Sequence, residues 1–198
     1  MKSLSLSKPH LIIMVGIPGS GKSFFAEHFA DTFKAPIVSF HRFRQELFNS
    51  PTFSKNEEDI ISQVANYMLD EIFKTGRTIV YEGRTNTRAE RTLLAKKTRE
   101  AGYEPLFVWV QTEPLTAKKR ATKHNTDRLA MNEAQYNTEL KRFSIPHPTE
   151  KVIVISGKHT YASQLKIVLK RLVEPRIQTN EQINHVVRSP ISRNFLIR

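Results

Sequence analysis

The sequence predicts an α/β protein, in which a parallel sheet is covered by helices on both faces. Five short apolar runs alternate with longer helical segments along the chain, which is the pattern of strands joined by helical crossovers. The apolar runs lack a clean polar–apolar alternation, as is typical of strands buried on both faces. With 198 residues, the chain is long enough for one domain with a substantial core.

Hydrophobic spacing and helix-ending residues give the expected bounds of each element. Thr75-Gly76 and Ala101-Gly102 end two helices, and Pro105 and Pro114 bracket the fourth strand. The expected strands cover residues 11–15, 37–40, 78–81, 106–110 and 152–155. The expected helices cover residues 23–33, 42–48, 57–75, 88–101, 115–122, 132–143 and 161–172.

A phosphate-binding loop of the form G-x-x-x-x-G-K-[ST] lies between the first strand and the first helix. Its residues are Gly16-Ile17-Pro18-Gly19-Ser20-Gly21-Lys22-Ser23. The glycines let the backbone turn tightly, so that successive N–H groups point at an anion, and the following helix adds its positive N-terminal end. We therefore expect ATP here, with Lys22 on the β- and γ-phosphates and Ser23 on Mg²⁺.

The composition narrows the partners and the compartment. A net charge of +12 and a pI near 10.0 favour anionic partners beyond the nucleotide, nucleic acid first among them. The alternative is that the charge only keeps the protein soluble. The chain has no cysteine, which excludes disulfides and thiolate metal sites and fits a reducing compartment. No apolar run is long enough for a membrane span, and we expect a cytoplasmic protein without a membrane partner.

Four further segments, in order and spacing, resemble the polynucleotide kinase and zeta-toxin-like group of P-loop kinases, with AAA-type ATP binding. They read PIVSFHRFRQELFNS, TIVYEGRTNTRAER, LTAKKRATKH and FSIPHPTEKVIVIS, and the resemblance covers roughly residues 10–172. It implies a P-loop NTPase fold with a five-stranded parallel sheet and a helical lid at about residues 115–143. The kinase domain would span residues 1–174, followed by a basic tail at 175–198.

The resemblance also implies roles for residues after the second strand. In this group an acidic residue there accepts the proton of the attacking hydroxyl, and an arginine three positions later holds an anion on the acceptor. Here the arginine is Arg44, but His41 stands where the acidic residue belongs. An imidazole can act as a base near neutral pH, so we expect either a catalytic His41 or a surface histidine at the strand end.

A carboxylate follows the third strand, where the group carries Asp-Ala-Thr-Asn and this chain has Glu82-Gly83-Arg84-Thr85. We expect Glu82 to hold Mg²⁺ through water or to act on the acceptor, the alternative being a solvated strand-end acid. On the next helix, Arg88 and Arg91 face either the acceptor groove or solvent. Arg88 is the expected acceptor contact of the two.

The segment that resembles the lid supplies a further arginine. Arg120 occupies the position from which lid arginines reach the transferred phosphate and stabilise its charge. The alternative is a solvated basic helix face. One turn later this chain has His124 in place of a second basic residue, for which Lys123 or Arg128 could substitute.

These features predict an ATP-dependent kinase that phosphorylates a hydroxyl, with the 5′-hydroxyl of a polynucleotide as the expected acceptor. A small-molecule kinase for a nucleotide or sugar nucleotide is the first alternative. The second is a nucleic-acid-binding protein that responds to ATP and has little transferase activity, which the His41 substitution keeps open. The high positive charge favours the polynucleotide acceptor.

Overall fold

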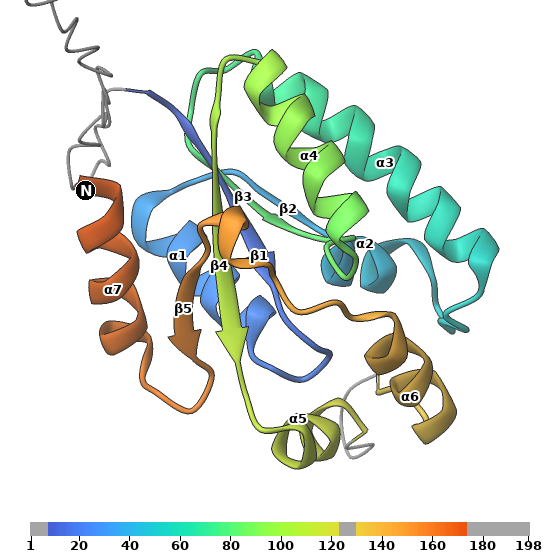
Figure 1. Cartoon of the computed structure of the whole chain (residues 1–198). Coiled ribbons are helices and arrows are strands. Elements are labelled where there is room, and N and C mark those ends of the chain that lie inside the picture. The colour runs from blue at the N-terminus through green and yellow to red at the C-terminus, as the bar shows by residue number, and fades with distance from the viewer. Residues whose placement is uncertain (1–7, 123–129, 174–198) are drawn as a thin grey trace, which may run out of the picture.

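Five parallel strands form one sheet in the computed structural model, which describes residues 8–122 and 130–173 (Figure 1). The strand order is β2-β3-β1-β4-β5. The strands are β1 (His10–Val15), β2 (Ile37–Ser39), β3 (Ile79–Glu82), β4 (Glu104–Gln111) and β5 (Ile153–Ser156). Helices connect them along the chain and lie on both faces of the sheet, which confirms the predicted fold class.

Two layers of helices cover the two faces of the sheet, and α5 and α6 lie beyond one edge of it (Figure 1). Helices α3 and α4 cover one face, and α1 and α7 cover the other. The helical elements are α1 (Lys22–Phe33), α2 (Phe40–Leu47), α3 (Lys55–Phe73), α4 (Arg88–Glu100), α5 (Pro114–Ala121), α6 (Glu133–Arg142), the short 3-10 turn η1 (Pro148–Glu150) and α7 (Tyr161–Val173).

The central strand β1 is buried on both faces, as its apolar run predicts. Leu11, Ile13 and Val15 pack in the core beneath α3 and α4, and Ile12 and Met14 pack in the core beneath α1 and α7. Full burial of one such side chain contributes about 1.5–3 kcal/mol. The strand that carries the phosphate-binding loop is therefore firmly fixed.

Two predicted boundaries were wrong for physical reasons. The Ser39 side chain accepts a hydrogen bond from the Arg42 N–H and caps α2, so Phe40 and His41 lie in the helix and not at the strand end. Pro105 lies inside β4, where it pairs with Leu11. The Glu104 N–H donates toward β1, and β4 pairs with β5 only from Val108 onward, so the missing N–H of Pro105 faces a side without a neighbouring strand.

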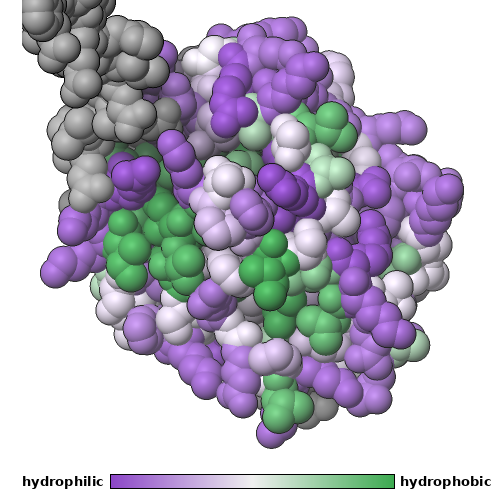
Figure 2. Space-filling view, viewed as in Figure 1, coloured by the Kyte–Doolittle hydropathy of each residue, from purple (hydrophilic) through white to green (hydrophobic). Residues whose placement is uncertain are grey.

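All five strands point their carboxyl ends to the same edge of the sheet. The phosphate-binding loop follows β1 at this edge, and α5 and α6 lie beyond it in Figure 1. The predicted lid residues 123–129 and the tail 175–198 lie outside the described residues. No helix within the described residues is both long and apolar enough to cross a membrane. The face in Figure 2 is mostly hydrophilic, with hydrophobic side chains in a few separate groups.

Candidate active site

The phosphate-binding loop packs directly against α5. Gly19 has a positive φ of 73°, and a Cβ at this position would lie 2.1 Å from the Ala117 backbone oxygen on α5. Only glycine fits both the conformation and the close approach. At the end of the loop, Gly21 precedes the first residue of α1, so the N-terminal end of this helix faces the loop.

Lys22 reaches back over the loop that it follows. Its Nζ donates hydrogen bonds to the backbone oxygens of Gly16 at 2.8 Å and Ile17 at 3.0 Å. Burial lowers the pKa of Lys22 below its usual value, although the carboxylates of Glu82 and Glu139 act in the opposite direction. The ammonium group is thus held within the loop where phosphates are expected.

Glu82 joins the phosphate-binding loop to the neighbouring strands. Its Oε1 accepts a hydrogen bond from Ser23 Oγ at 2.5 Å, and its Oε2 accepts one from Ser39 Oγ at 2.7 Å. Ser39 also pairs with Glu82 in the register of β2 and β3. Glu82 is only 6% exposed, so the alternative of a solvated strand-end acid was wrong.

The residues at this point fit a magnesium ion bound jointly with nucleotide phosphates. A hydroxyl and a carboxylate are the hard oxygen donors that Mg²⁺ prefers, and this ion keeps several waters and takes phosphate oxygens as further ligands. Ser23 and Glu82 would hold it, and it would offset negative charge on the phosphates. Among the described residues, no cluster of three or more His, Asp or Glu side chains could hold a metal by itself.

His41 lies in the first turn of α2, two positions after the capping residue Ser39. Its Nδ1 is buried and has no hydrogen-bond partner among the described residues. A catalytic imidazole is normally oriented by a bond to its second ring nitrogen. The described part of the chain provides no such bond for His41.

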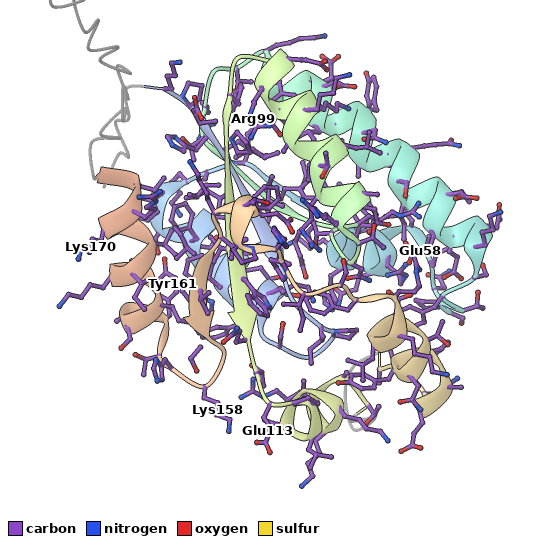
Figure 3. The ribbon with its side chains drawn as sticks, viewed as in Figure 1. Glu58, Arg99, Glu113, Lys158, Tyr161 and Lys170 are labelled. Carbon is purple, nitrogen blue, oxygen red and sulfur yellow. The ribbon has the colours of Figure 1, made fainter. Side chains whose placement is uncertain are left out.

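Arg44 is buried between α2 and α3 and is engaged by protein carboxylates. Its guanidinium donates to Glu58 and lies 3.9 Å from Oε2 of Glu57, with its carbon 4.6 Å from the centre of the Phe53 ring. Figure 3 shows Glu58 on α3 beside α2. The arginine that was predicted to hold an anion on the acceptor thus already contacts two negative groups.

Glu57 fixes the connection between α2 and α3. Its carboxylate accepts hydrogen bonds from the N–H groups of Thr52 and Phe53, both at 2.7 Å. Burial raises the pKa of Glu57, but these bonds, the Thr52 hydroxyl and the charge of Arg44 outweigh it, so the pKa lies below its usual value. The Arg44 environment is therefore part of a folded connection.

Helix α5 and the turn after β5 enclose the phosphate-binding loop. Arg120 donates to the Gly157 oxygen at 3.0 Å, and Thr112 Oγ1 donates to the Ser20 oxygen at 2.8 Å. A Cβ on Gly157 would lie 2.0 Å from the Ser20 oxygen. Glu113 and Lys158 pair at 3.2 Å across the same junction (Figure 3). Sequence reasoning missed Thr112 and Gly157, since neither belongs to a motif.

The two arginines of α4 that were predicted as site candidates differ in burial. Arg88, at the start of the helix, is exposed, and its backbone N–H donates to Ser144 Oγ at 2.9 Å. Arg91 is fully buried, and its guanidinium binds both carboxylate oxygens of Glu150 at 2.6 and 3.0 Å. The prediction that Arg91 faces the acceptor groove or solvent was wrong, because this residue shares the buried face of the helix with Leu94.

Helix α6 contacts the loop between β3 and α4. Asn86 Nδ2 donates to Glu139 Oε2 at 2.6 Å, and the Ser144 N–H donates to the Asn86 oxygen at 2.8 Å. Glu139 was not among the predicted site residues, because sequence spacing does not show that α6 approaches Asn86. The proposed lid residues Lys123, His124 and Arg128 lie outside the described residues.

A phosphate-binding loop after the central strand, a parallel sheet of order β2-β3-β1-β4-β5 and a carboxylate at the end of β3 define a P-loop protein with the fold of P-loop kinases. Residues 11–146 match the family AAA_33, described as an AAA domain. The chain belongs to this family. A search of curated proteins found no match.

Solved structures share the fold at low sequence identity. A gluconokinase from Sinorhizobium meliloti 1021 is 16% identical with a TM-score of 0.58, over 83% of this chain and 91% of that chain. Chaetomium thermophilum Kti12, solved with ADP-AlF3, is 13% identical with a TM-score of 0.64, over 83% and 100%. A chain of the Pnkp1/Rnl/Hen1 RNA repair complex is 22% identical with a TM-score of 0.57, over 70% of this chain and 45% of that chain. These similarities support the P-loop kinase fold.

Proposed function

We propose that this protein is an ATP-dependent kinase that transfers the γ-phosphate of ATP to a hydroxyl group. The observation that carries the proposal is the contact between Ser23 of the phosphate-binding loop and the Glu82 carboxylate at 2.5 Å. It supports the proposal because a hydroxyl and a carboxylate, oxygen groups of the kind that Mg²⁺ prefers, lie beside the loop that contains Lys22. Phosphoryl transfer needs little more from a protein than such positioning and charge.

Each residue has a defined task in the proposed reaction. Loop N–H groups and Lys22 bind the phosphates, and Ser23 and Glu82 hold the magnesium ion that accompanies ATP. The acceptor oxygen forms a bond to the γ-phosphorus while the bond to the ADP oxygen breaks. Arg120 on α5 is the proposed source of positive charge for the transferred group.

The acceptor that we propose is the 5′-hydroxyl of a polynucleotide. The net charge of +12 supports an anionic polymer, because lysines and arginines neutralise backbone phosphates. Arg88 at the start of α4 is exposed and is the proposed contact to the acceptor. The similarity to a chain of an RNA repair complex agrees with this acceptor.

A small-molecule acceptor is the second candidate, and one observation favours it. The guanidinium of Arg44 contacts Glu57 and Glu58, so its charge is already offset where an acceptor anion was expected. A small acceptor whose anionic group does not reach Arg44 has no need of that charge. The similarity to a gluconokinase is consistent with this candidate.

Transfer of radiolabelled γ-phosphate tests both candidates. The acceptors are 5′-hydroxyl DNA and RNA oligonucleotides, nucleosides, nucleotides, sugar nucleotides and sugar acids. The same oligonucleotides with a 5′-phosphate are the controls for the oligonucleotide acceptors. Label on the 5′-hydroxyl oligonucleotide alone supports the polynucleotide acceptor, and label on a metabolite alone supports the second candidate. Nucleic-acid binding that changes with ATP, without transfer to any acceptor, would contradict the kinase and favour an ATP-regulated binding protein.

A further inference from the structure

Glu139 brings a carboxylate of α6 to the edge of the sheet where the phosphate-binding loop lies. It accepts a hydrogen bond from Asn86 at 2.6 Å. Asn86 follows Thr85, whose hydroxyl donates to the Met14 backbone oxygen at 2.9 Å, next to the end of β1. The bonded chain from β1 through the β3–α4 loop therefore fixes the position of the Glu139 carboxylate at this edge.

The charge of Glu139 acts on the phosphate-binding lysine. Glu139 and Glu82 are the two carboxylates that raise the pKa of Lys22 against the lowering effect of burial. Lys22 Nζ is itself held over the backbone oxygens of Gly16 and Ile17. The geometry agrees, because Glu139 Oε2 lies 2.6 Å from Asn86 Nδ2, in the loop that follows Glu82 at the same edge of the sheet as Lys22.

Glu82 and Glu139 differ in whether their carboxylate oxygens can still accept a proton from a substrate hydroxyl. Glu82 is 6% exposed, and its oxygens are bound by Ser23 and Ser39. The side chain of Glu139 is 27% exposed, with one oxygen bound by Asn86 and the other by Arg142 at 3.0 Å. A carboxylate has about four acceptor positions, so a partly exposed one with two bonds can still receive a hydroxyl proton.

We propose that Glu139 is the catalytic base that removes the proton from the acceptor hydroxyl. The inference rests on the proposed kinase function. The acceptor oxygen forms a bond to the γ-phosphorus, the bond between this phosphorus and the ADP oxygen breaks, ADP leaves with that electron pair, and the hydroxyl proton moves to the Glu139 carboxylate. The role falls to Glu139 because His41 lacks an orienting partner among the described residues and Glu82 is occupied.

An isosteric substitution separates the proton acceptor from the structural contact. In Glu139→Gln the side-chain oxygen can still accept from Asn86, but the amide cannot take a proton. Glu133→Gln is the matched control, because Glu133 lies on the same helix, is exposed and pairs with Lys118 at 2.7 Å. We expect the kcat of Glu139→Gln to fall on the order of 10²-fold or more, and the control to match the wild type.

Two further measurements test whether Glu139→Gln lowers the kcat only by disturbing the structure of the site. Calorimetric titration of each variant with ATP measures any effect of the lost charge through Lys22. Because Glu82 still raises the pKa of Lys22, we expect the Kd to change far less than the kcat. Glu139→Asp keeps a carboxylate and is expected to retain more activity than Glu139→Gln. Equal losses in both variants, or a wild-type kcat in Glu139→Gln, would overturn the assignment.

The pH profile gives an independent readout. A carboxylate base stays deprotonated to a lower pH than an imidazole base, so the acidic limb of the kcat profile is expected to be the same in wild type and His41→Ala. An acidic limb that disappears in His41→Ala would overturn the Glu139 assignment and select His41. Wild-type transfer with no effect of Glu139→Gln refutes only this inference, whereas absence of wild-type transfer to every acceptor in the panel refutes the proposed function as well.

Discussion

Ser23 and Glu82 are 59 positions apart in the chain, and their side chains meet at 2.5 Å. Ser23 belongs to the first turn of α1, and Glu82 is the last residue of β3, the strand beside β1. A parallel sheet brings these two carboxyl-end positions together, because neighbouring strands run in the same direction. The contact therefore follows from the topology that places the loop after the central strand.

Glu82→Gln is expected to weaken the use of magnesium. The amide keeps one oxygen for Ser23 or Ser39 but loses the negative charge that favours a divalent cation. We expect a higher Mg²⁺ concentration for half-maximal transfer and a lower kcat, measured by titration of Mg²⁺ at saturating ATP. Glu27→Gln is the control, since Glu27 lies on α1 and, within the part of the chain that the structure describes, pairs at the surface with Arg42 at 3.5 Å. A Mg²⁺ titration that matches the wild type would contradict the role of Glu82.

Lys22→Ala is expected to remove most of the transfer activity, by on the order of 10²-fold or more, because a charge on the phosphates is lost. It also leaves the backbone oxygens of Gly16 and Ile17 without their lysine partner. We expect a cost of about 1 kcal/mol in stability without nucleotide. Thermal unfolding with and without ATP measures both effects. An ATP-dependent rise in Tm equal to that of the wild type, together with full activity, would show that the ATP site is elsewhere.

Local patterns made the fold and the loop predictable. The apolar run of β1, the glycines of the loop and the spacing of Phe25 and Phe29 all lie within about twenty residues, so short-range spacing is sufficient. Boundaries failed where a tertiary contact decided them. Ser39 caps α2, and Pro105 stays in β4 because one side of that strand has no neighbour at this point.

The rest of the site depends on contacts between distant segments. Glu139 reaches Asn86 across 53 positions, and Arg91 reaches Glu150 across 59. The sequence marks Arg91 as basic, but only the packing of α4 shows that its side chain turns inward. Gly157 follows a strand, and nothing in the local sequence shows that the Ser20 backbone comes too close for a Cβ at this position.

Gly157→Ala is expected to disturb the phosphate-binding loop from outside the motif. The added Cβ would lie 2.0 Å from the Ser20 oxygen and 2.2 Å from Thr112 Oγ1, so the loop or the turn must shift. We expect weaker ATP binding, on the order of tenfold or more, measured by calorimetry. Gly76→Ala is the control: its φ of 65° makes alanine strained, but its Cβ meets nothing within 4 Å. If both variants lower stability alike and neither weakens ATP binding, the steric argument fails.

Glu58→Gln tests whether Arg44 serves an anionic acceptor. The substitution removes a negative charge that the Arg44 guanidinium now contacts, so more positive potential is available to an anion nearby. For a polynucleotide acceptor we expect a several-fold lower KM with little change in kcat. Asp59→Asn, at the exposed neighbouring position on α3, is the control for the charge change. An unchanged or higher KM would indicate that Arg44 serves only to anchor the α2–α3 connection.

The buried pair of Arg91 and Glu150 is expected to make stability depend on pH. Arg91 is fully buried, and Glu150→Gln leaves its charge without a carboxylate, which costs on the order of 3–5 kcal/mol. Burial raises the pKa of Glu150, but the bonds from Arg91 and the His147 N–H and the charge of Arg91 outweigh it, so the pKa is lowered from 4.5.

The sign of the pH effect follows from that lowered pKa. A carboxyl with a lower pKa in the folded state contributes stability above its unfolded value of 4.5, and this contribution is lost as the pH falls through the folded value. Urea unfolding of wild type and Glu150→Gln between pH 7 and pH 3 measures the difference. We expect the difference between the two free energies of unfolding to shrink as the pH falls below 4.5, while Glu71→Gln, at an exposed pair with Lys74, follows the wild type. A constant difference between wild type and Glu150→Gln across this range would show that the pair does not titrate with folding.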